Sequence, residues 1–130
     1  MEPFLTVIVK PTLDCNLHCR HCYHTSSDRS PQSLYIETFE KTVKLVTEGF
    51  ESSRYIWHGG EPLLEPMSFY KKAFAVQKKY YGKRGCDNTI QTSGSLLSQR
   101  FIEFCKSNRV NLGVSYEGGF DNGLRPGFWI

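Results

Sequence analysis

Long apolar runs are absent from this sequence of 130 residues. No stretch approaches the roughly 20 consecutive apolar residues that a membrane-spanning helix needs. The first apolar run is short and ends at Lys10 and Pro11, so we expect neither a membrane span nor a secretory signal peptide. An excess of one charge is also missing, because the formal net charge is only +3. We therefore expect no membrane and no nucleic-acid partner.

Linkers, low-complexity segments and long repeats are lacking as well, which favours one globular domain with a small core. The basic residues between Lys71 and Arg84 are expected to form a solvated helix face and the loop that follows it.

Cysteine occurs in an odd number, five, which argues against a framework of disulfides. Cys15, Cys19 and Cys22 are close together, at a spacing that suits a metal. We therefore expect a reducing, cytoplasmic environment. Cys105 falls on the apolar face of a predicted helix and is expected to be a core thiol. Cys86 is expected to be a free cysteine in a surface loop.

Hydrophobic periodicity predicts strands that alternate with helices. Short β-branched or apolar runs predict strands at 4–9, 54–58, 89–92 and 110–116. Three helices are predicted between them, with apolar faces formed by Ile36, Phe39, Val43 and Val46, then by Phe69, Ala73, Val76 and Tyr80, then by Leu97, Phe101 and Phe104. Gly49 is expected to end the first helix and Pro66 to open the second. This order predicts a parallel α/β sheet covered by helices.

Unusual polar motifs come directly after each predicted strand. The carboxyl ends of parallel strands meet at one edge of the sheet, where α/β proteins bind ligands. The strongest motif is Cys15-x3-Cys19-x2-Cys22. Three thiolates on one loop can hold three irons of a cubane cluster and leave the fourth iron open to a small molecule. The alternative is a zinc site that adds His18, His21 or His24 as the fourth ligand.

The cysteine spacing, followed by Tyr23, resembles the signature of the radical S-adenosylmethionine superfamily. Gly59-Gly60-Glu61-Pro62 resembles the family's GGEP motif. Gln91 to Gly94 resembles the QTNG motif of the subgroup with a C-terminal SPASM domain, with Ser93 in place of Asn. Val114 to Gly118 resembles its VSxDG motif, with Glu117 in place of Asp. The four matches occur in order and cover nearly the whole chain.

The resemblance implies a 4Fe–4S cluster on Cys15, Cys19 and Cys22, and S-adenosylmethionine as the cosubstrate. A reductant such as flavodoxin or ferredoxin would supply one electron, and the 5′-deoxyadenosyl radical would abstract hydrogen from a substrate. The subgroup implies a peptide or protein substrate, as in peptide maturases and sulfatase-activating enzymes. The cofactor carries the difficult chemistry, and the protein orients it.

The resemblance also suggests roles for cosubstrate-binding residues. Gly59 and Gly60 would let the backbone approach a ligand closely. Glu61 would accept hydrogen bonds from the methionine ammonium; its alternative is a solvated loop carboxylate. Ser93 and Ser115 would bind ribose hydroxyls or the methionine carboxylate. Their alternative is to cap turns locally.

Four further residues have open roles. Tyr23 would pack against the adenine or in the core. Arg125 would pair with the methionine carboxylate or have no such role. Gln91 would face the barrel interior or bond to loop backbone, and His58 is expected at most to line the site.

The expected fold is a partial (β/α) barrel with about four parallel strands. The family barrel has six strand–helix units, so we expect residues 1–130 to form part of the core domain, without the auxiliary cluster domain. Two alternatives follow. In the first, the chain binds the cluster but catalyses nothing until it self-associates or a completing chain joins it. In the second, the chain is a small zinc-binding interaction module.

Overall fold

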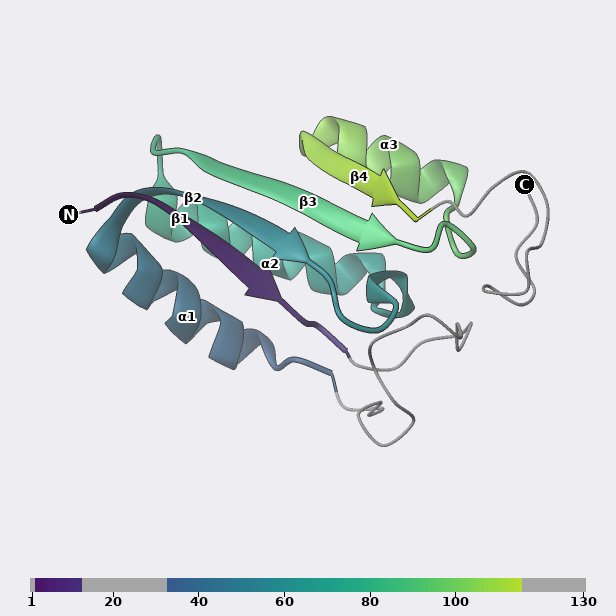
Figure 1. The fold of residues 1–130 in the computed structure, drawn as a ribbon, viewed down its shortest axis with the longest axis horizontal. Coiled ribbons are helices and arrows are strands. Elements are labelled where there is room, and N and C mark those ends of the chain that lie inside the picture. The colour runs from purple at the N-terminus through teal and green to yellow at the C-terminus, as the bar shows by residue number, and fades with distance from the viewer. Residues whose placement is uncertain (1, 13–32, 116–130) are drawn as a thin grey trace.

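The computed structural model describes residues 2–12 and 33–115. Four strands form one sheet in the order β1-β2-β3-β4, and each neighbouring pair is parallel (Figure 1). The strands are β1 (Glu2–Val9), β2 (Phe50–Trp57), β3 (Cys86–Thr92) and β4 (Val110–Val114). The helices are α1 (Ile36–Gly49), α2 (Met67–Tyr81) and α3 (Gln99–Ser107). The predicted partial barrel of alternating strands and helices is confirmed.

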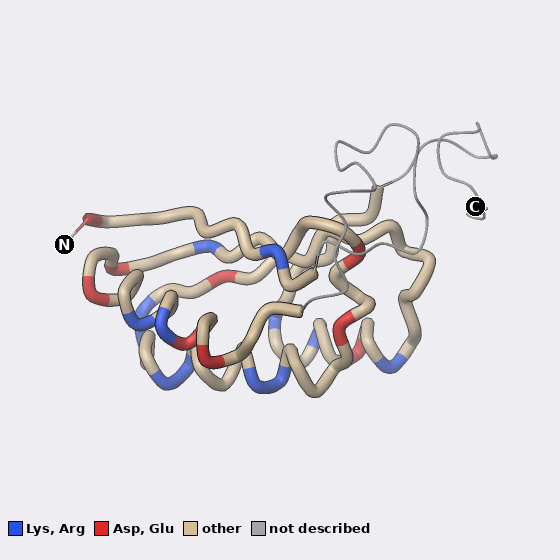
Figure 2. The backbone as a smooth tube through the Cα atoms, turned by 90° about the horizontal axis from the view of Figure 1, so that it is seen from below, with Lys and Arg blue, Asp and Glu red and all other residues tan. Residues whose placement is uncertain are grey.

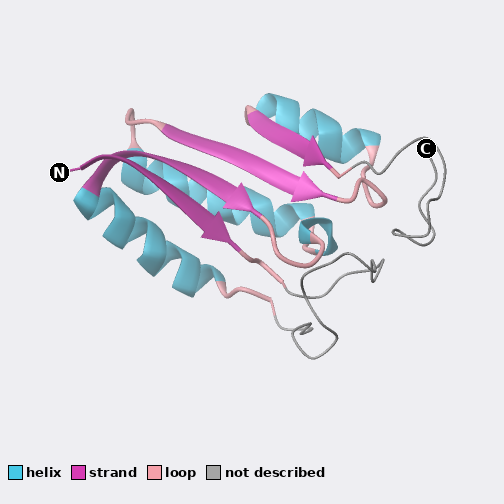
Figure 3. Cartoon of the chain, viewed as in Figure 1, coloured by secondary structure: helices cyan, strands magenta, loops and turns pink. Residues whose placement is uncertain are grey.

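The three helices cover one face of the sheet (Figure 2). The described helices and loops leave the other face largely open, and Phe4 and Ile8 on β1 are exposed there by 47% and 63%. All four strand arrows end at the same edge, where the loops that follow β2 and β3 begin (Figure 3). None of the helices in the described ranges is long and apolar enough to cross a membrane.

Helix ends follow local sequence signals. Gly49 is the last residue of α1, and the chain passes directly into β2 at Phe50. Pro66 stands at the N-cap of α2, where its missing N–H costs no hydrogen bond. Gly82 caps the other end of α2 with a φ of 59°, a conformation that glycine adopts without strain. The Ser98 hydroxyl accepts a hydrogen bond from the Phe101 N–H at 3.1 Å and so caps α3.

The core lies between the sheet and the helices and is centred on Trp57. Its indole packs against Phe39 of α1 and Tyr70 of α2, with ring centroids 5.1 and 5.4 Å away. The indole N–H donates to Asn88 Oδ1 at 2.9 Å. Asn88 also exchanges hydrogen bonds with Gln77, at 2.9 and 2.7 Å. The buried amides are therefore satisfied within the core, as low-dielectric surroundings require.

The predicted apolar face of α2 is wrong by about one residue. The buried residues of this helix are Tyr70, Ala73, Gln77 and Tyr81. Of the four predicted positions, Ala73 is buried, whereas Phe69, Val76 and Tyr80 are only partly buried. The reason is the polar pair described above: Asn88 gives Gln77 a buried partner, so the helix turns that polar side chain inward.

Two further expectations need correction. Cys86 is the first residue of β3 and half-buried, not in a surface loop. Arg84 is not part of a solvated basic face, because its guanidinium donates to the carbonyls of Thr47, Phe50 and Tyr80, at 3.0 to 3.3 Å. It thereby holds the C-terminal ends of α1 and α2 together. The lysines of the same run are exposed, as predicted.

Candidate functional site

The base of the cysteine loop lies at the carboxyl end of β1. Thr12 and Ser33 form an antiparallel bridge, and the Leu34 N–H donates to the Pro11 carbonyl at 2.7 Å. The segment between them, with Cys15, Cys19, Cys22 and Tyr23, lies outside the described residues. These two contacts therefore fix where the loop begins after β1 and where it ends before α1.

The turn after β2 rests on this base. The His58 N–H donates to Val9 O at 2.9 Å, and the Gly60 N–H donates to Thr12 O at 3.0 Å. Gly59 has a φ of 107°, and a Cβ on it would lie 2.9 Å from the Thr12 carbonyl oxygen. Glycine is required there both by the backbone conformation and by the close approach of two chain segments. The Gly59-Gly60 turn and the base of the cysteine loop therefore form one unit.

Glu61 links this unit to the end of β3. One carboxylate oxygen accepts from the Leu63 N–H at 2.9 Å and from the Thr92 hydroxyl at 2.7 Å. The other accepts from the Ser93 N–H at 2.9 Å. The side chain is only 1% exposed, so the alternative of a solvated loop carboxylate is wrong. Contact with a methionine ammonium stays a prediction, for which about one of the roughly four lone-pair sites of the carboxylate remains.

Tyr70 supports the same turn from α2. Its hydroxyl donates to the Pro62 carbonyl at 2.6 Å, inside the short 3-10 helix Pro62–Leu64 that Glu61 caps. Burial raises the pKa of the Tyr70 phenol, and the nearby Glu65 and Glu61 carboxylates raise it further. The phenol therefore stays protonated and remains a hydrogen-bond donor.

The turn after β3 is capped by its own side chains. The Ser93 and Ser95 hydroxyls lie 2.9 Å apart, and the Ser95 N–H donates to Ser93 Oγ at 3.3 Å. The Gly94 N–H donates to Thr92 Oγ1 at 3.1 Å. Ser93 therefore does cap this turn locally, which was the alternative to ligand binding; a ligand contact of the same hydroxyl stays a prediction.

Gln91 and Ser115 link β3 to the chain that leaves β4. Gln91 Nε2 donates to Ser115 Oγ at 3.2 Å, and the Ser115 N–H donates to the Thr92 carbonyl at 3.0 Å. Gln91 lies between the buried residues Ile90 and Thr92, so it occupies the face of the sheet that the helices leave open. The same alternation places His58, next to buried Trp57, on that open face.

The structure thus brings Gly59, Gly60, Glu61, Ser93 and Ser115 to one edge of the sheet, as their positions after predicted strands had indicated. Arg125 and Glu117 lie outside the described residues.

Sequence reasoning missed Thr12, whose carbonyl accepts from the Gly60 N–H, and Thr92, whose hydroxyl donates to Glu61. It also missed Gly113, although a glycine inside a strand is a known sign of a close approach.

A parallel α/β half-barrel with linked polar turns at its carboxyl edge is a ligand-binding architecture. The sequence of the chain matches the Radical SAM superfamily over residues 9–127. The chain therefore belongs to this superfamily.

Curated relatives narrow the comparison to sulfatase-maturating enzymes. The chain is 39% identical over 122 residues to a serine-type anaerobic sulfatase-maturating enzyme of Bacteroides thetaiotaomicron, covering 88% of this chain and 30% of the relative. It is 34% identical over 124 residues to a cysteine-type enzyme of Clostridium perfringens, covering 89% and 34%. The chain thus spans about a third of the length of these relatives.

Solved structures point to the same group of enzymes as the sequence comparison. The fold matches histidine-tagged anSMEcpe with bound AdoMet at a TM-score of 0.85 and 28% identity, over 93% of this chain and 34% of that one. It matches native anSMEcpe with bound AdoMet and Cp18Cys peptide at a TM-score of 0.82 and 27% identity, over 93% and 33%. The arrangement of strands and helices found here is therefore that of a radical SAM core.

Proposed function

We propose that this chain forms the cosubstrate-binding part of a radical S-adenosylmethionine enzyme that modifies a peptide or protein. Cys15, Cys19 and Cys22 would hold a 4Fe–4S cluster. Such a cluster would supply one electron for the cleavage of S-adenosylmethionine into methionine and a 5′-deoxyadenosyl radical, which would abstract hydrogen from the substrate. A reductant such as flavodoxin or ferredoxin would deliver that electron.

The main observation in support of this proposal is that the base of the cysteine loop is hydrogen-bonded to the Gly59-Gly60 turn. The Gly60 N–H donates to the carbonyl of Thr12, three residues before the first cysteine of the motif, at 3.0 Å. Glu61 then links the turn to Ser93, and Gln91 links β3 to Ser115. A small molecule held at this edge would therefore lie next to Thr12 and Ser33, the two described ends of the loop that carries the cysteines.

The protein residues would orient and shield the cosubstrate. Glu61 would accept from the methionine ammonium, and the Ser93 and Ser115 hydroxyls would bind its oxygen atoms. Precise orientation contributes strongly to rate, because well-placed reactants can lower a barrier by roughly 7–11 kcal/mol. The connected hydrogen bonds from Thr12 to Ser115 are suited to such fixed placement.

Anaerobic reconstitution of the full chain with iron and sulfide tests the cluster. We expect iron and sulfide to bind, and Cys15→Ala, Cys19→Ala and Cys22→Ala each to abolish this binding. Cys86→Ala, outside the motif, is the matched control and should bind as the parent does. Iron retained by all three loop variants would overturn the assignment, and a colourless chain that binds only zinc would favour the zinc module.

The proposed cleavage of S-adenosylmethionine is tested by incubating the reconstituted chain with dithionite and S-adenosylmethionine. We expect residues 1–130 alone to form little or no 5′-deoxyadenosine, because they cover only about a third of the length of these relatives. Multiple-turnover formation that depends on an added sulfatase-type peptide containing Ser or Cys would show that this chain suffices for catalysis. Cluster binding without any 5′-deoxyadenosine would favour the alternative of a non-catalytic chain that needs a partner. Mass spectrometry of the peptide distinguishes substrate turnover from uncoupled cleavage.

A further inference from the structure

Gln91 and Gly113 are register partners in the β3–β4 ladder. They lie side by side near the carboxyl ends of the two strands, which run parallel in Figure 1. A Cβ built on Gly113 would overlap the Oε1 atom of Gln91. The amide of Gln91 therefore lies across the position where any other residue at 113 would have its side chain.

The backbone at Gly113 gives no other reason for glycine. The glycines with positive φ in the described residues are Gly59, Gly82 and Gly94, and Gly113 is not among them. Glycine within a strand is unfavourable unless something comes close to the backbone. Here the group that comes close is the Gln91 amide, so Gly113 provides the space that this side chain occupies.

The amide uses this space to reach Ser115. Gln91 Nε2 donates to Ser115 Oγ at 3.2 Å, while the Ser115 N–H is bonded to Thr92 O at 3.0 Å. An amide nitrogen is a donor only, so the hydroxyl oxygen accepts this bond. The Ser115 O–H then keeps its proton for a different acceptor. The direction of the Gln91 bond thus leaves the Ser115 O–H available to donate to another group.

We propose that Gln91 is a positioning residue that, in the space left by Gly113, holds the Ser115 hydroxyl as a hydrogen-bond donor to an oxygen atom of the bound cosubstrate. The proposal rests on the proposed function, because it takes S-adenosylmethionine as the ligand of this edge. Gln91 itself acts through Ser115 and needs no contact with the ligand. The pair would thereby favour ligands that present a carboxylate or hydroxyl oxygen at this point.

Three variants separate this role from a general loss of structure. Gly113→Ala should displace the Gln91 amide without altering it chemically, and Gln91→Ala should remove it. Each should weaken S-adenosylmethionine binding by about twofold to tenfold, the range for one net hydrogen bond. Gln91→Glu should be worse, because a carboxylate only accepts and would take the Ser115 proton away from the ligand.

The measurement is the dissociation constant of S-adenosylmethionine for the reconstituted full chain, by equilibrium dialysis, with the thermal midpoint recorded for every variant. In the Gln91→Ala background, Gly113→Ala should have no further effect, because the overlapping atom is gone. Thr89→Ala, one open-face position earlier on β3, is the control and should bind as the parent does. Additive losses from Gln91→Ala and Gly113→Ala, or unchanged binding in Gly113→Ala, would overturn the proposal.

A second readout does not depend on the cosubstrate. The side-chain amide signals of Gln91 in an isotope-labelled chain should shift in Ser115→Ala and in Gly113→Ala, and stay in place in Thr89→Ala. If the parent chain binds no S-adenosylmethionine while these shifts occur, the proposed function fails and the hydrogen bond stands. If the parent binds and the amide signals do not respond, the positioning role is wrong and the proposed function stands.

Discussion

The helix-covered face of the sheet and its carboxyl edge are both held together by connected contacts, but the kinds of contact differ. On the covered face, aromatic rings from α1 and α2 surround Trp57, and the amides are paired with each other. At the edge, a single carboxylate, Glu61, collects donors from two different turns. The covered face resembles an ordinary apolar core, whereas the edge resembles the supporting shell of a binding site.

This difference indicates which substitutions should affect mainly the stability of the fold and which should affect mainly the candidate site. Loss of packing on the covered face affects all three helices at once, because their rings share contacts. Loss of a hydrogen bond at the edge loosens one turn relative to the next and leaves the core intact. Substitutions on the covered face should therefore lower the global stability strongly. Substitutions at the edge should lower it less and should mainly increase local opening of one turn.

The largest effect is expected from Trp57→Ala. The indole is fully buried and its N–H is one of two donors to Asn88 Oδ1, the other being Gln77, so truncation leaves a cavity and removes one hydrogen bond. Removing a buried large aromatic residue typically costs about 3–5 kcal/mol of unfolding free energy, a large part of the total stability of a domain. Urea unfolding followed by circular dichroism measures this loss. Leu45→Ala, on an exposed position of α1, is the control and should be close to neutral.

A Trp57→Ala chain that unfolds at the same urea concentration as the parent would break the distinction between the two regions. Trp57→Phe keeps an aromatic ring but not the N–H donor. We expect it to be less destabilising than the alanine variant, which separates packing from hydrogen bonding.

The next effect is expected from Glu61→Ala. It leaves the N–H groups of Leu63 and Ser93 without their acceptor, and an orphaned buried donor costs about 1–3 kcal/mol. The loss should be local, so native-state hydrogen exchange at the Ser93 amide should accelerate more than exchange in the core strands. Glu61→Gln keeps one carbonyl oxygen and should be milder. If Glu61→Ala weakened ligand binding while Ser93 exchange stayed unchanged, the carboxylate would act as a ligand group without a supporting role.

The two described cysteines provide a smaller, pH-dependent test. Burial raises the pKa of Cys86 to about 12, helped by Asp87, and burial raises that of Cys105 to about 11. Since the thiolate is the reactive form, alkylation at about pH 8 should be slower than in the urea-unfolded chain by on the order of 100-fold. Mass spectrometry after iodoacetamide treatment measures this. Equal rates for folded and unfolded chains would show that these thiols are not protected.

The same shifts fix the sign of the pH dependence of stability. Below the unfolded pKa of 9.0, both thiols are protonated in either state and contribute no slope. Above it, the unfolded chain loses protons that the folded chain keeps, so the free energy of unfolding falls as the pH rises toward 11. Thermal unfolding across this alkaline range tests it, and a midpoint that rises there would contradict both pKa shifts.

The order of elements and the meeting of the motifs at one edge were predictable from the sequence, because both depend on local periodicity. Strand patterns, Pro66 and Gly49 mark where elements begin and end, and parallel strands must end at a common edge. The buried Cys105 was predictable for the same reason, since it shares a helical face with Phe101. These features need no knowledge of which residues meet across the fold.

The pairs formed between distant segments were not predictable in this way. Gln77 is buried because Asn88 meets it from another element, and Arg84 is half-buried because two helix ends converge on it. Glu61 was identified as a site residue by its motif, but its donors Thr92 and Ser93 come from the next strand and turn. Polar residues such as these carry no periodic signal, so only the tertiary structure shows what they do.

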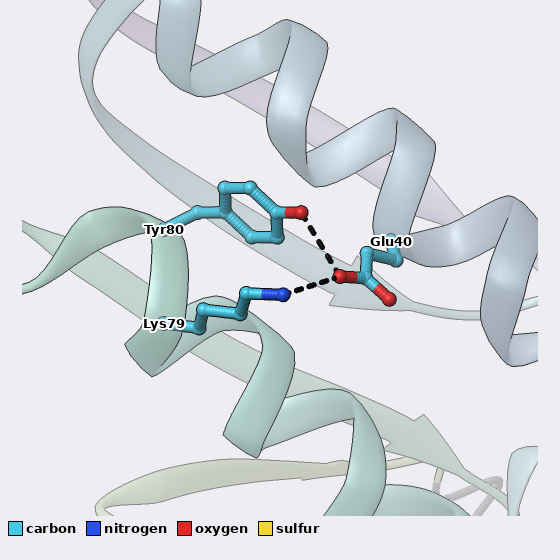
Figure 4. A network of polar contacts seen from close by, with 3 residues as sticks. All are labelled: Glu40, Lys79 and Tyr80. Atoms are coloured by element: carbon cyan, nitrogen blue, oxygen red, sulfur yellow. Dashed lines mark hydrogen bonds and ion pairs between the residues drawn. The ribbon is translucent and has the colours of Figure 1, made fainter.

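The smallest effect is expected at the link between α1 and α2 on the outer surface. One carboxylate oxygen of Glu40 accepts from Lys79 Nζ at 3.0 Å and from the Tyr80 hydroxyl at 2.9 Å (Figure 4). The Lys79 and Tyr80 hydrogen bonds lower the pKa of Glu40. Its contribution to stability is therefore present above its ordinary pKa of 4.5 and lost as the pH falls through the lowered value.

Because this link is exposed, solvent and salt screen it, and exposed ion pairs contribute little. Glu40→Ala should lower the thermal midpoint less than Trp57→Ala or Glu61→Ala. Salt at roughly 1 M should shrink the difference, since charges then interact only over about 3 Å. Glu48→Ala removes the same charge from α1 and serves as the control. A Glu40→Ala loss as large as that of Glu61→Ala would mean that the helix layer depends on its surface links, and that packing around Trp57 is not what holds it.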